Sequence, residues 1–415
     1  MNDIVYFDNQ STTKPDPRVV ESMLPYLSEK YGNPQSMHSV GAEARDAIDE
    51  ARANVAALIN ASSAREIIFT SSGSESNNLA IKGVAEAYEK DGRHIVVSSV
   101  EHFSVLNAAR RLERRGYEVT QIGVDEYGTI IFEELEQSIR PDTILVSIQH
   151  ANTEVGTIQP LKKIVEIVRR KNPKTVIHTD AVGTAGNIPV DVKELGIDLL
   201  SLAASQFYGP KGAAALFVKK GIRIIPQTDG GIQEEGRRAG TENVAAIVGM
   251  GTAAAIAGIE IPSVSARITI LRNHLIDLLP KKIKYVKLNG HPTERLPGNV
   301  NFSIEFIEGE GMLLMLDAKK ICASSGSACT SKALKLSHVL NAMKVDPAAA
   351  QGSLLFTLSK YNTMEEVEYA LTELPPIVER LRSMSPTYAH FLKTGKRMAA
   401  GPGTDYEHHH DTGEE

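Results

Sequence analysis

The sequence predicts an α/β protein in which helices cover a mainly parallel sheet. Short runs rich in β-branched residues alternate with segments of helical periodicity from about residue 67 to 203, and this alternation is typical of β-α-β units. The chain has 415 residues, of which 42% are hydrophobic, so it is long enough for two substantial domains. From about residue 255 the pattern changes to long helices and few strands, which predicts a smaller C-terminal α+β domain.

The elements follow in order along the chain. Apolar residues at helical spacing predict an amphipathic helix over 42–59. Strands are expected at 67–70, 94–98, 143–147, 175–178 and 199–203, with a further apolar run at 213–218. In the second domain, strands are expected at 285–289 and 299–303.

The division into domains follows from these patterns. We expect a large domain over residues 1–255, whose N-terminal segment packs with the small domain, then a small domain over 256–390 and a flexible tail over 391–415. The tail contains His408 to His410, which we interpret as decoration of a flexible segment; weak metal binding is the alternative.

Composition and charge exclude several classes of function. The formal net charge is -6, with basic and acidic residues interspersed, so direct nucleic-acid binding is not expected. The first residues carry no basic region and no apolar run approaches a membrane span, which predicts a cytoplasmic protein with no membrane partner. Cys322 and Cys329 are too few for a disulfide framework or a metal cluster. A functional thiol would therefore act singly.

Polar residues follow several of the predicted strands. Residues 70–76 (Thr-Ser-Ser-Gly-Ser-Glu-Ser) lie between a strand and a helical pattern that begins near Asn77. The N–H groups of such a helix start suit a phosphate, although a plain serine cap is the alternative. His102 lies just past one strand and Asp180 ends another. Ligands of such sheets bind at the carboxyl ends of the strands, but a single histidine is more often structural.

A second group of small polar residues surrounds one cysteine. Residues 324–331 (Ser-Ser-Gly-Ser-Ala-Cys-Thr-Ser) contain Gly326 and no large apolar side chain, which is typical of an exposed loop. Cys329 in such a loop is available to react. Cys322 lies among apolar residues, so we expect it to be a small buried hydrophobe.

The stretch 198–212 has the layout of a strand that ends in a cofactor-anchoring turn. It reads Asp-Leu-Leu-Ser-Leu-Ala-Ala-Ser-Gln-Phe-Tyr-Gly-Pro-Lys-Gly. With the opening at 6–15, the segments 70–76 and 324–331, Glu101-His102, and the Gly-rich stretch 230–243, it resembles the cysteine desulfurases, which are class V aminotransferase-like proteins. The resemblance extends from Tyr6 to about Lys393.

This resemblance implies a fold and a set of functional residues. The fold would be that of the fold type I transferases that use pyridoxal 5'-phosphate (PLP), with a seven-stranded sheet. The resemblance further implies the following roles: Gly73 and Ser74 contact the phosphate, Asp180 pairs with the pyridinium nitrogen, His102 stacks on the ring and acts as acid or base, and Thr241 reaches the phosphate of the neighbouring subunit of a homodimer.

The same resemblance implies that the protein handles sulfur. Cys329 would attack the sulfur of L-cysteine and carry it as a persulfide for iron-sulfur cluster assembly or tRNA thiolation. An iron-sulfur scaffold protein would dock on the segment 381–391, and Cys329 could also help to ligate a cluster shared with it.

Several positions depart from the family pattern. Gln206 stands where the family has the lysine that forms the Schiff base, and Leu355 stands where it has an arginine for the substrate carboxylate. The other departures, all in residues expected to line the cofactor, are Ser205 for His, Ala203 for Ser or Thr, Gly183 for Gln and Thr153 for Asn. PLP would therefore bind without a Schiff base at position 206. Lys211 could in principle supply the missing amine. The family, however, keeps a lysine in this turn in addition to the Schiff-base lysine.

Three functions stay open from the sequence. The first is a cysteine desulfurase homologue that supplies sulfur from L-cysteine as a Cys329 persulfide. The second is a sulfur-relay or scaffold-binding protein that keeps Cys329 but has lost desulfuration. The third is a different PLP reaction that needs no enzyme lysine.

Overall fold

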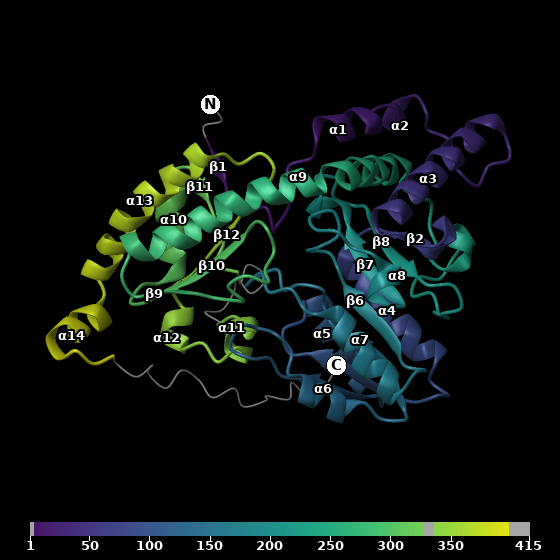
Figure 1. Cartoon of the computed structure of the whole chain (residues 1–415). Coiled ribbons are helices and arrows are strands. Elements are labelled where there is room, and N and C mark those ends of the chain that lie inside the picture. Colours follow the sequence, from purple (N-terminus) through teal and green to yellow (C-terminus); the bar gives the residue numbers. More distant parts are fainter. Residues whose placement is uncertain (1–3, 327–335, 398–415) are drawn as a thin grey trace, which may run out of the picture.

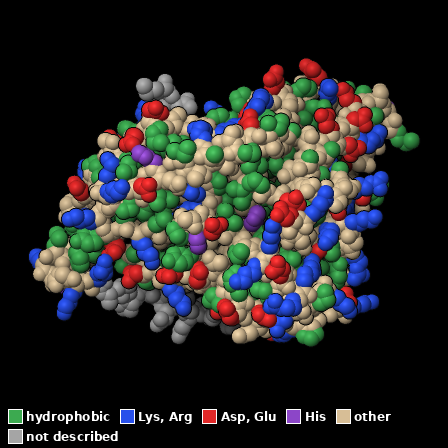
Figure 2. Space-filling model, viewed as in Figure 1, with side chains coloured by type: hydrophobic (Ala, Val, Ile, Leu, Met, Phe, Trp, Pro, Cys, Tyr) green, Lys and Arg blue, Asp and Glu red, His purple; other side chains and the backbone are tan. Residues whose placement is uncertain are grey.

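The computed structural model describes residues 4–326 and 336–397. It has two parts, each built on its own sheet, and one long helix, α9 (Val244–Lys282), runs across both (Figure 1). In the view of Figure 2, side chains of both charges are interspersed over most of the visible face.

The larger part is organised around a seven-stranded sheet. Its strand order is β2-β8-β7-β6-β5-β3-β4, and β8 alone runs antiparallel to its neighbours. The strands are β2 (Ile67–Thr70), β3 (His94–Ser98), β4 (Glu118–Ile122), β5 (Thr143–Ser147), β6 (Val176–Asp180), β7 (Leu199–Ala203) and β8 (Ala214–Val218). This confirms the predicted fold class. The strand expected at 175–178 extends to Asp180, because Thr179 and Asp180 pair with β7.

Helices cover both faces of this sheet. On β3, Ile95 and Val97 belong to one hydrophobic cluster and Val96 to another, as the alternation of side chains along a doubly covered strand requires. The helices of this part are α1 (Pro17–Met23), α2 (Pro25–Ser28), α3 (Ser39–Leu58), α4 (Gly73–Ala87), α5 (Phe103–Glu113), α6 (Phe132–Ser138), α7 (Leu161–Lys171) and α8 (Val192–Leu195). The structure confirms the helix predicted over 42–59.

The smaller part has an antiparallel sheet in the order β12-β10-β9 and a parallel pair, β1 with β11. Phe7, which follows β1, packs edge-on against Phe356 of β12 in its core. Its strands are β1 (Val5–Tyr6), β9 (Val286–Leu288), β10 (Asn299–Ile304), β11 (Ile321–Cys322) and β12 (Ser353–Thr357). Its helices are α10 (Gly309–Asp317), α13 (Met364–Ser383) and α14 (Pro386–Thr394). Two short helices, α11 (His338–Ala342) and α12 (Pro347–Ala350), lie between the two parts, and their buried side chains Val339, Leu340 and Ala350 belong to the hydrophobic cluster of the larger part.

The helix α9 spans the predicted domain boundary and changes one expectation. The predicted domain boundary near residue 255 falls inside it, so one continuous helix serves both parts. Its apolar stretch is also long enough to cross a membrane, contrary to the expectation that no run approaches that length. Within the protein, however, 56% of that stretch is buried, and α9 packs on α1, α3 and α13. Its apolar character therefore follows from its place in the core.

Candidate active site

Asp180 lies at the carboxyl end of β6 and is buried. Its Oδ2 accepts a hydrogen bond from Asn77 Nδ2 at 2.7 Å, and its Oδ1 accepts from the backbone N–H of Val182 at 2.9 Å. Burial raises the pKa of the Asp180 carboxyl above its ordinary value, because a low-dielectric surrounding disfavours the charged form. A cationic N–H partner would offset that cost.

The first turn of α4 lies against the residues that follow Asp180. Ser72 caps the helix, its Oγ accepting from Glu75 N at 3.1 Å. A Cβ on Gly73 would lie 2.6 Å from Cγ2 of Val182, so glycine permits the close approach. The serine cap is therefore present at the helix start for which the sequence predicted phosphate binding. The helix begins at Gly73, earlier than the sequence pattern near Asn77 indicated, and its first N–H groups lack intrahelical partners.

His102 caps the neighbouring helix α5. Its exposed imidazole accepts at Nδ1 from Ser104 N at 3.1 Å, with Ser104 Oγ 2.7 Å away. Ser104 Oγ in turn accepts from Asn77 Nδ2 at 2.9 Å. One amide group of Asn77 therefore bonds both to Ser104 and to Asp180. This network assigns the ring proton of neutral His102 to Nε2.

Asn77 and Ser104 were not among the residues expected from the sequence. An asparagine inside a helix and a serine in a first turn are common at structural positions. Only the packing of α4 beside α5 reveals their joint role. Together they connect two predicted site residues, His102 and Asp180, that are far apart in the chain.

Gln206 ends a short 3-10 helix, Ala204–Gln206, directly after β7. Its side chain is buried, and its Nε2 donates to the backbone oxygen of Gln10 at 2.9 Å. The preceding residue, Ser205, accepts at its backbone oxygen from both N and Oγ1 of Thr13, each at 2.9 Å. These hydrogen bonds to the N-terminal segment therefore hold the turn in place. Lys211, farther along the turn, is exposed.

Gly183 and Thr153 lie in contact although they come from different loops. A Cβ on Gly183 would lie 2.6 Å from Cγ2 of Thr153. The threonine methyl group therefore occupies the space beside the glycine, and the size of one side chain limits the other. Ala203, at the end of β7, is buried.

Leu355 lies on β12 and is buried. Its backbone exchanges hydrogen bonds with Ser324, at 3.1 Å and 2.7 Å. Its neighbours Leu354 and Phe356 belong to the small-domain core, and side chains alternate along a strand, so Leu355 faces the other side of the sheet. Ser324 precedes the segment that carries Cys329, which lies outside the described residues.

Thr241 is exposed and follows Gly240, whose φ is +104°. The same Gly-rich stretch contacts the first turn of α4, where Nε of Arg238 lies 2.8 Å from Oε1 of Glu75. Near the start of this stretch, the buried Glu234 forms an ion pair at 2.7 Å with Arg52, which is partly exposed. The stretch is therefore tied to the helix start that carries Gly73 and Ser74.

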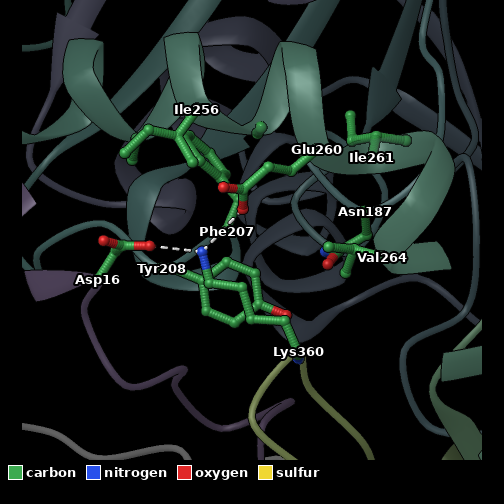
Figure 3. Close-up of a pocket in the computed structure, with 12 residues that line it drawn as sticks. Asp16, Asn187, Phe207, Tyr208, Ile256, Glu260, Ile261, Val264 and Lys360 are labelled. Carbon is green, nitrogen blue, oxygen red and sulfur yellow. Dashed lines mark hydrogen bonds and ion pairs between the residues drawn. The ribbon is translucent and has the colours of Figure 1, made fainter. Parts of the chain in front are cut away.

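Lys360 is a largely buried amine near the turn that follows Gln206 (Figure 3). Its Nζ lies 2.6 Å from Asp16 Oδ2 and 3.1 Å from Glu260 Oε2, at 4.5 Å from the centre of the Tyr208 ring. Hydrogen bonds from Arg18 and Lys360 lower the pKa of Asp16. Lys360 is thus one of two cations, with Arg18, in an ion-pair network that joins the two parts of the protein, and its amine is engaged.

The cysteine and histidine predictions have mixed outcomes. Cys322, on β11, is partly buried instead of fully buried, and burial raises the pKa of its thiol. Among residues 4–326 and 336–397, no group of three His, Cys, Asp or Glu side chains is arranged for a metal ion. Cys329, the possible shared cluster ligand, and His408 to His410 lie outside these ranges.

The doubly covered, mainly parallel sheet with polar groups at the carboxyl ends of its strands has the fold of the PLP fold type I class, which solved NifS-like structures share. The family model for class-V aminotransferases matches residues 5–370. A solved structure of a NifS-like protein superposes with a TM-score of 0.86 at 40% identity, covering 91% of this chain and 100% of that one. The apo cysteine desulfurase of Thermococcus onnurineus NA1 does so with a TM-score of 0.82 at 25% identity, covering 92% and 96%.

Curated relatives agree with these matches. The cysteine desulfurase IscS 1 of Archaeoglobus fulgidus is 50% identical over 383 residues, which cover 92% of this chain and 99% of that protein. The cysteine desulfurase IscS of Methanosarcina thermophila is 50% identical over 385 residues, covering 93% and 94%. The chain belongs to the class-V aminotransferase family and, within it, to the cysteine desulfurases.

Proposed function

We propose that this protein supplies sulfur from L-cysteine for iron-sulfur cluster assembly and carries that sulfur as a persulfide on Cys329. The observation that carries the proposal is the hydrogen-bonded set Asp180, Asn77, Ser104 and His102 beside the first turn of α4. It joins an acidic group, an imidazole and a helix start at one edge of the sheet. Membership of the cysteine desulfurase family supports the assignment.

The described residues fit the non-covalent part of a PLP site. Gly73 and Ser74 would hold the phosphate at the N-terminus of α4, and Asp180 would pair with the ring nitrogen. Gly183, Thr153 and Ser205 would line the site, with Thr241 reaching the site of the partner subunit. Bound in this way, PLP supplies an electron sink at the substrate carbon.

The covalent part of such a site does not fit position 206. Gln206 stands where the family places its Schiff-base lysine, and an amide nitrogen is delocalised into its carbonyl, so it is no useful nucleophile. Its Nε2 is also committed to the Gln10 carbonyl. We propose that PLP binds here without a covalent link to residue 206.

In the proposed sulfur step, this chain would supply the attacking thiol and the proton, and bound PLP would supply the electron sink. The Cys329 sulfur attacks the sulfur of L-cysteine, a sulfur–sulfur bond forms and the carbon–sulfur bond of the substrate breaks. The substrate carbon takes up a proton, so that L-cysteine and a thiol become alanine and a persulfide. His102, whose Nε2 edge is free of the Ser104 network, is the proposed group that moves the proton.

A relay of sulfur from another persulfide is the second candidate. Two observations favour it: the committed amide of Gln206, and the buried apolar Leu355 at the position where the family has a carboxylate-binding arginine. In a relay, Cys329 attacks the outer sulfur of a donor persulfide, and the donor leaves as a thiol. This reaction needs neither PLP nor a substrate clamp.

The proposed partners are a second copy of this chain and an iron-sulfur scaffold protein. Four large apolar side chains, Leu24, Leu27, Tyr31 and Met37, are exposed within one short stretch, which is typical of an interaction surface. They support a homodimer, to be tested by light scattering. We place the protein in the cytoplasm.

One experiment separates the two candidates. The protein is incubated with 34S-labelled L-cysteine and PLP, or with a labelled persulfide donor alone, and the Cys329 peptide is analysed by mass spectrometry. Label from L-cysteine supports desulfuration, and label only from the persulfide donor supports the relay. The Cys329→Ser variant is the control. If neither the L-cysteine label nor the label of the persulfide donor reaches Cys329, both candidate functions are rejected.

A second measurement tests how the cofactor is held. The protein with PLP is treated with borohydride, and any fixed adduct is mapped by mass. We expect no adduct in the wild-type protein and an adduct at position 206 in the Gln206→Lys variant. An adduct on Lys211 in the wild-type protein would show that the covalent link has moved.

A further inference from the structure

His338 is a half-buried histidine at the first position of α11. Its Nε2 lies 3.0 Å from the backbone carbonyl oxygen of Glu101, the residue directly before His102. Because a carbonyl oxygen only accepts hydrogen bonds, Nε2 of His338 carries the ring proton and donates it. This hydrogen bond therefore joins α11 to the peptide unit that leads into His102.

The same imidazole also contacts the residue on the other side of His102. The centre of the His338 ring lies 4.6 Å from the centre of the Phe103 ring, with an angle of 44° between the two planes. At this distance aromatic rings attract each other. Phe103 is the first residue of α5. One side chain therefore contacts both neighbours of His102, the first at its backbone and the second at its ring.

The helix that carries His338 is anchored to the larger part of the protein. Ser337 caps it, because its Oγ accepts from the N–H groups of Val339 and Leu340 at 3.1 Å and 3.2 Å. The side chains of Val339 and Leu340 are buried in the hydrophobic cluster of the larger part. Burial also lowers the pKa of His338, so near neutral pH its ring is neutral and has a single proton. His338 is thus a donor in a fixed position.

The segment between β3 and α5 is also held from the loop that follows β5. The carbonyl oxygen of Val100 accepts from Nε2 of Gln149 at 2.8 Å and from Nδ2 of Asn152 at 3.1 Å. The buried side chain of Glu101 accepts at Oε1 from Gln149 N at 2.8 Å. The bond from His338 holds the next peptide unit. Because a peptide unit is planar, the direction of its carbonyl sets where the following side chain leaves the backbone.

We propose that His338 is a positioning residue for the imidazole of His102, because it holds the backbone on both sides of it. His102 is exposed, so packing around its own ring does little to orient it. The hydrogen bonds of its Nδ1 with Ser104 also require the backbone at 101–103 to keep its direction. The inference rests on the proposed role of His102 as the group that moves the proton, but the contacts of His338 depend on neither PLP nor L-cysteine.

The test measures how firmly Nδ1 of His102 is held in the protein without PLP. Diethyl pyrocarbonate acylates a neutral imidazole at a nitrogen whose lone pair is free, and peptide mass spectrometry gives the ratio of modified His102 to modified His38. His38 is the matched internal reference. It is also exposed, and it also caps a helix through Nδ1, which accepts from Gly41 N at 3.2 Å.

Two variants of His338 separate its donor from its ring. His338→Phe keeps an aromatic ring beside Phe103 but removes the donor to the Glu101 carbonyl. We expect the ratio of His102 to His38 modification to rise about fivefold in this variant, as for the loss of one hydrogen bond. His338→Gln restores an N–H donor, so its ratio should stay near that of the wild-type protein.

A control variant accounts for the loss of any half-buried histidine. His274→Phe removes a histidine that pairs with Glu368 of α13, and it should leave the ratio unchanged. An unchanged or lower ratio in His338→Phe, or a Gln variant that behaves like the Phe variant, would overturn the proposal. Neither result bears on whether L-cysteine is the sulfur source, which the labelling experiment decides.

Discussion

Asn77 Nδ2 lies 2.7 Å from Oδ2 of Asp180, and this bond joins the middle of one helix turn to the end of a central strand. Asn77 is fully buried, and its Oδ1 has no hydrogen-bond partner within the described part of the chain. The amide therefore serves mainly as a donor to Asp180 and to Ser104. By fixing the position of the Asp180 carboxyl, Asn77 sets part of the geometry of the proposed cofactor site.

Replacing Asn77 with alanine should weaken both stability and PLP binding. The buried Asp180 carboxylate would lose one of its two donors, so the free energy of unfolding should fall by about 1.5–3 kcal/mol. Urea unfolding measures the loss, and PLP fluorescence titration measures the affinity. Asn78→Ala, which removes only a surface bond to the Ser74 carbonyl, is the control; equal losses in both variants would contradict the role of Asn77.

The stability of the protein should fall as the pH rises above about 6.5. Burial raises the pKa of Glu101 from 4.5 to about 8, so between these values the folded state binds more protons than the unfolded state, and stability falls with pH. Buried His150, whose pKa burial lowers from 6.5 to about 4, acts in the opposite direction, but only below its unfolded value.

Glu101→Gln isolates this contribution. Between about pH 6.5 and 7.5 the wild-type protein should lose about 1.4 kcal/mol more than the variant, the linkage value for one proton over one pH unit. Urea midpoints at fixed protein concentration measure it. Parallel pH profiles for the two proteins would show that Glu101 is already ionised in the fold.

Gly183 and Thr153 should behave as a coupled pair. Gly183→Ala introduces a methyl group 2.6 Å from Cγ2 of Thr153, and such overpacking costs about 1–3 kcal/mol. Thr153→Ser removes that Cγ2, so the double variant should recover much of the loss. Thermal or urea unfolding of the wild-type protein, the two single variants and the double variant measures the coupling free energy. Strictly additive effects would mean that the two loops separate to admit the methyl group.

Arg52→Met should destabilise the Gly-rich stretch. Glu234 also accepts from Phe69 N at 2.9 Å and would remain buried without its cation, which costs about 3–5 kcal/mol. Urea unfolding measures the loss, and hydrogen exchange over residues 230–243 shows where it acts. Arg65→Met, at an exposed position, should change little. A loss below about 1 kcal/mol would show that the Glu234 carboxylate becomes hydrated or protonated in the absence of Arg52.

Local pattern was enough to predict much of this protein. Strands at 67–70, 94–98, 143–147 and 199–203 match the structure, because apolar runs of that length between turn residues have few other ways to bury themselves. The placing of His102 and Asp180 at strand ends followed from the same periodicity. Motif resemblance then led to the cysteine desulfurase family, which the comparisons confirm.

Other features depend on contacts between residues far apart in the chain. The sequence could not show that Gln206 bonds to Gln10, or that Thr153 fills the space beside Gly183. Periodicity reports which face of an element is buried, but not what lies against it. The apolar sequence of α9 had the same ambiguity until packing against α3 and α13 placed it in the core.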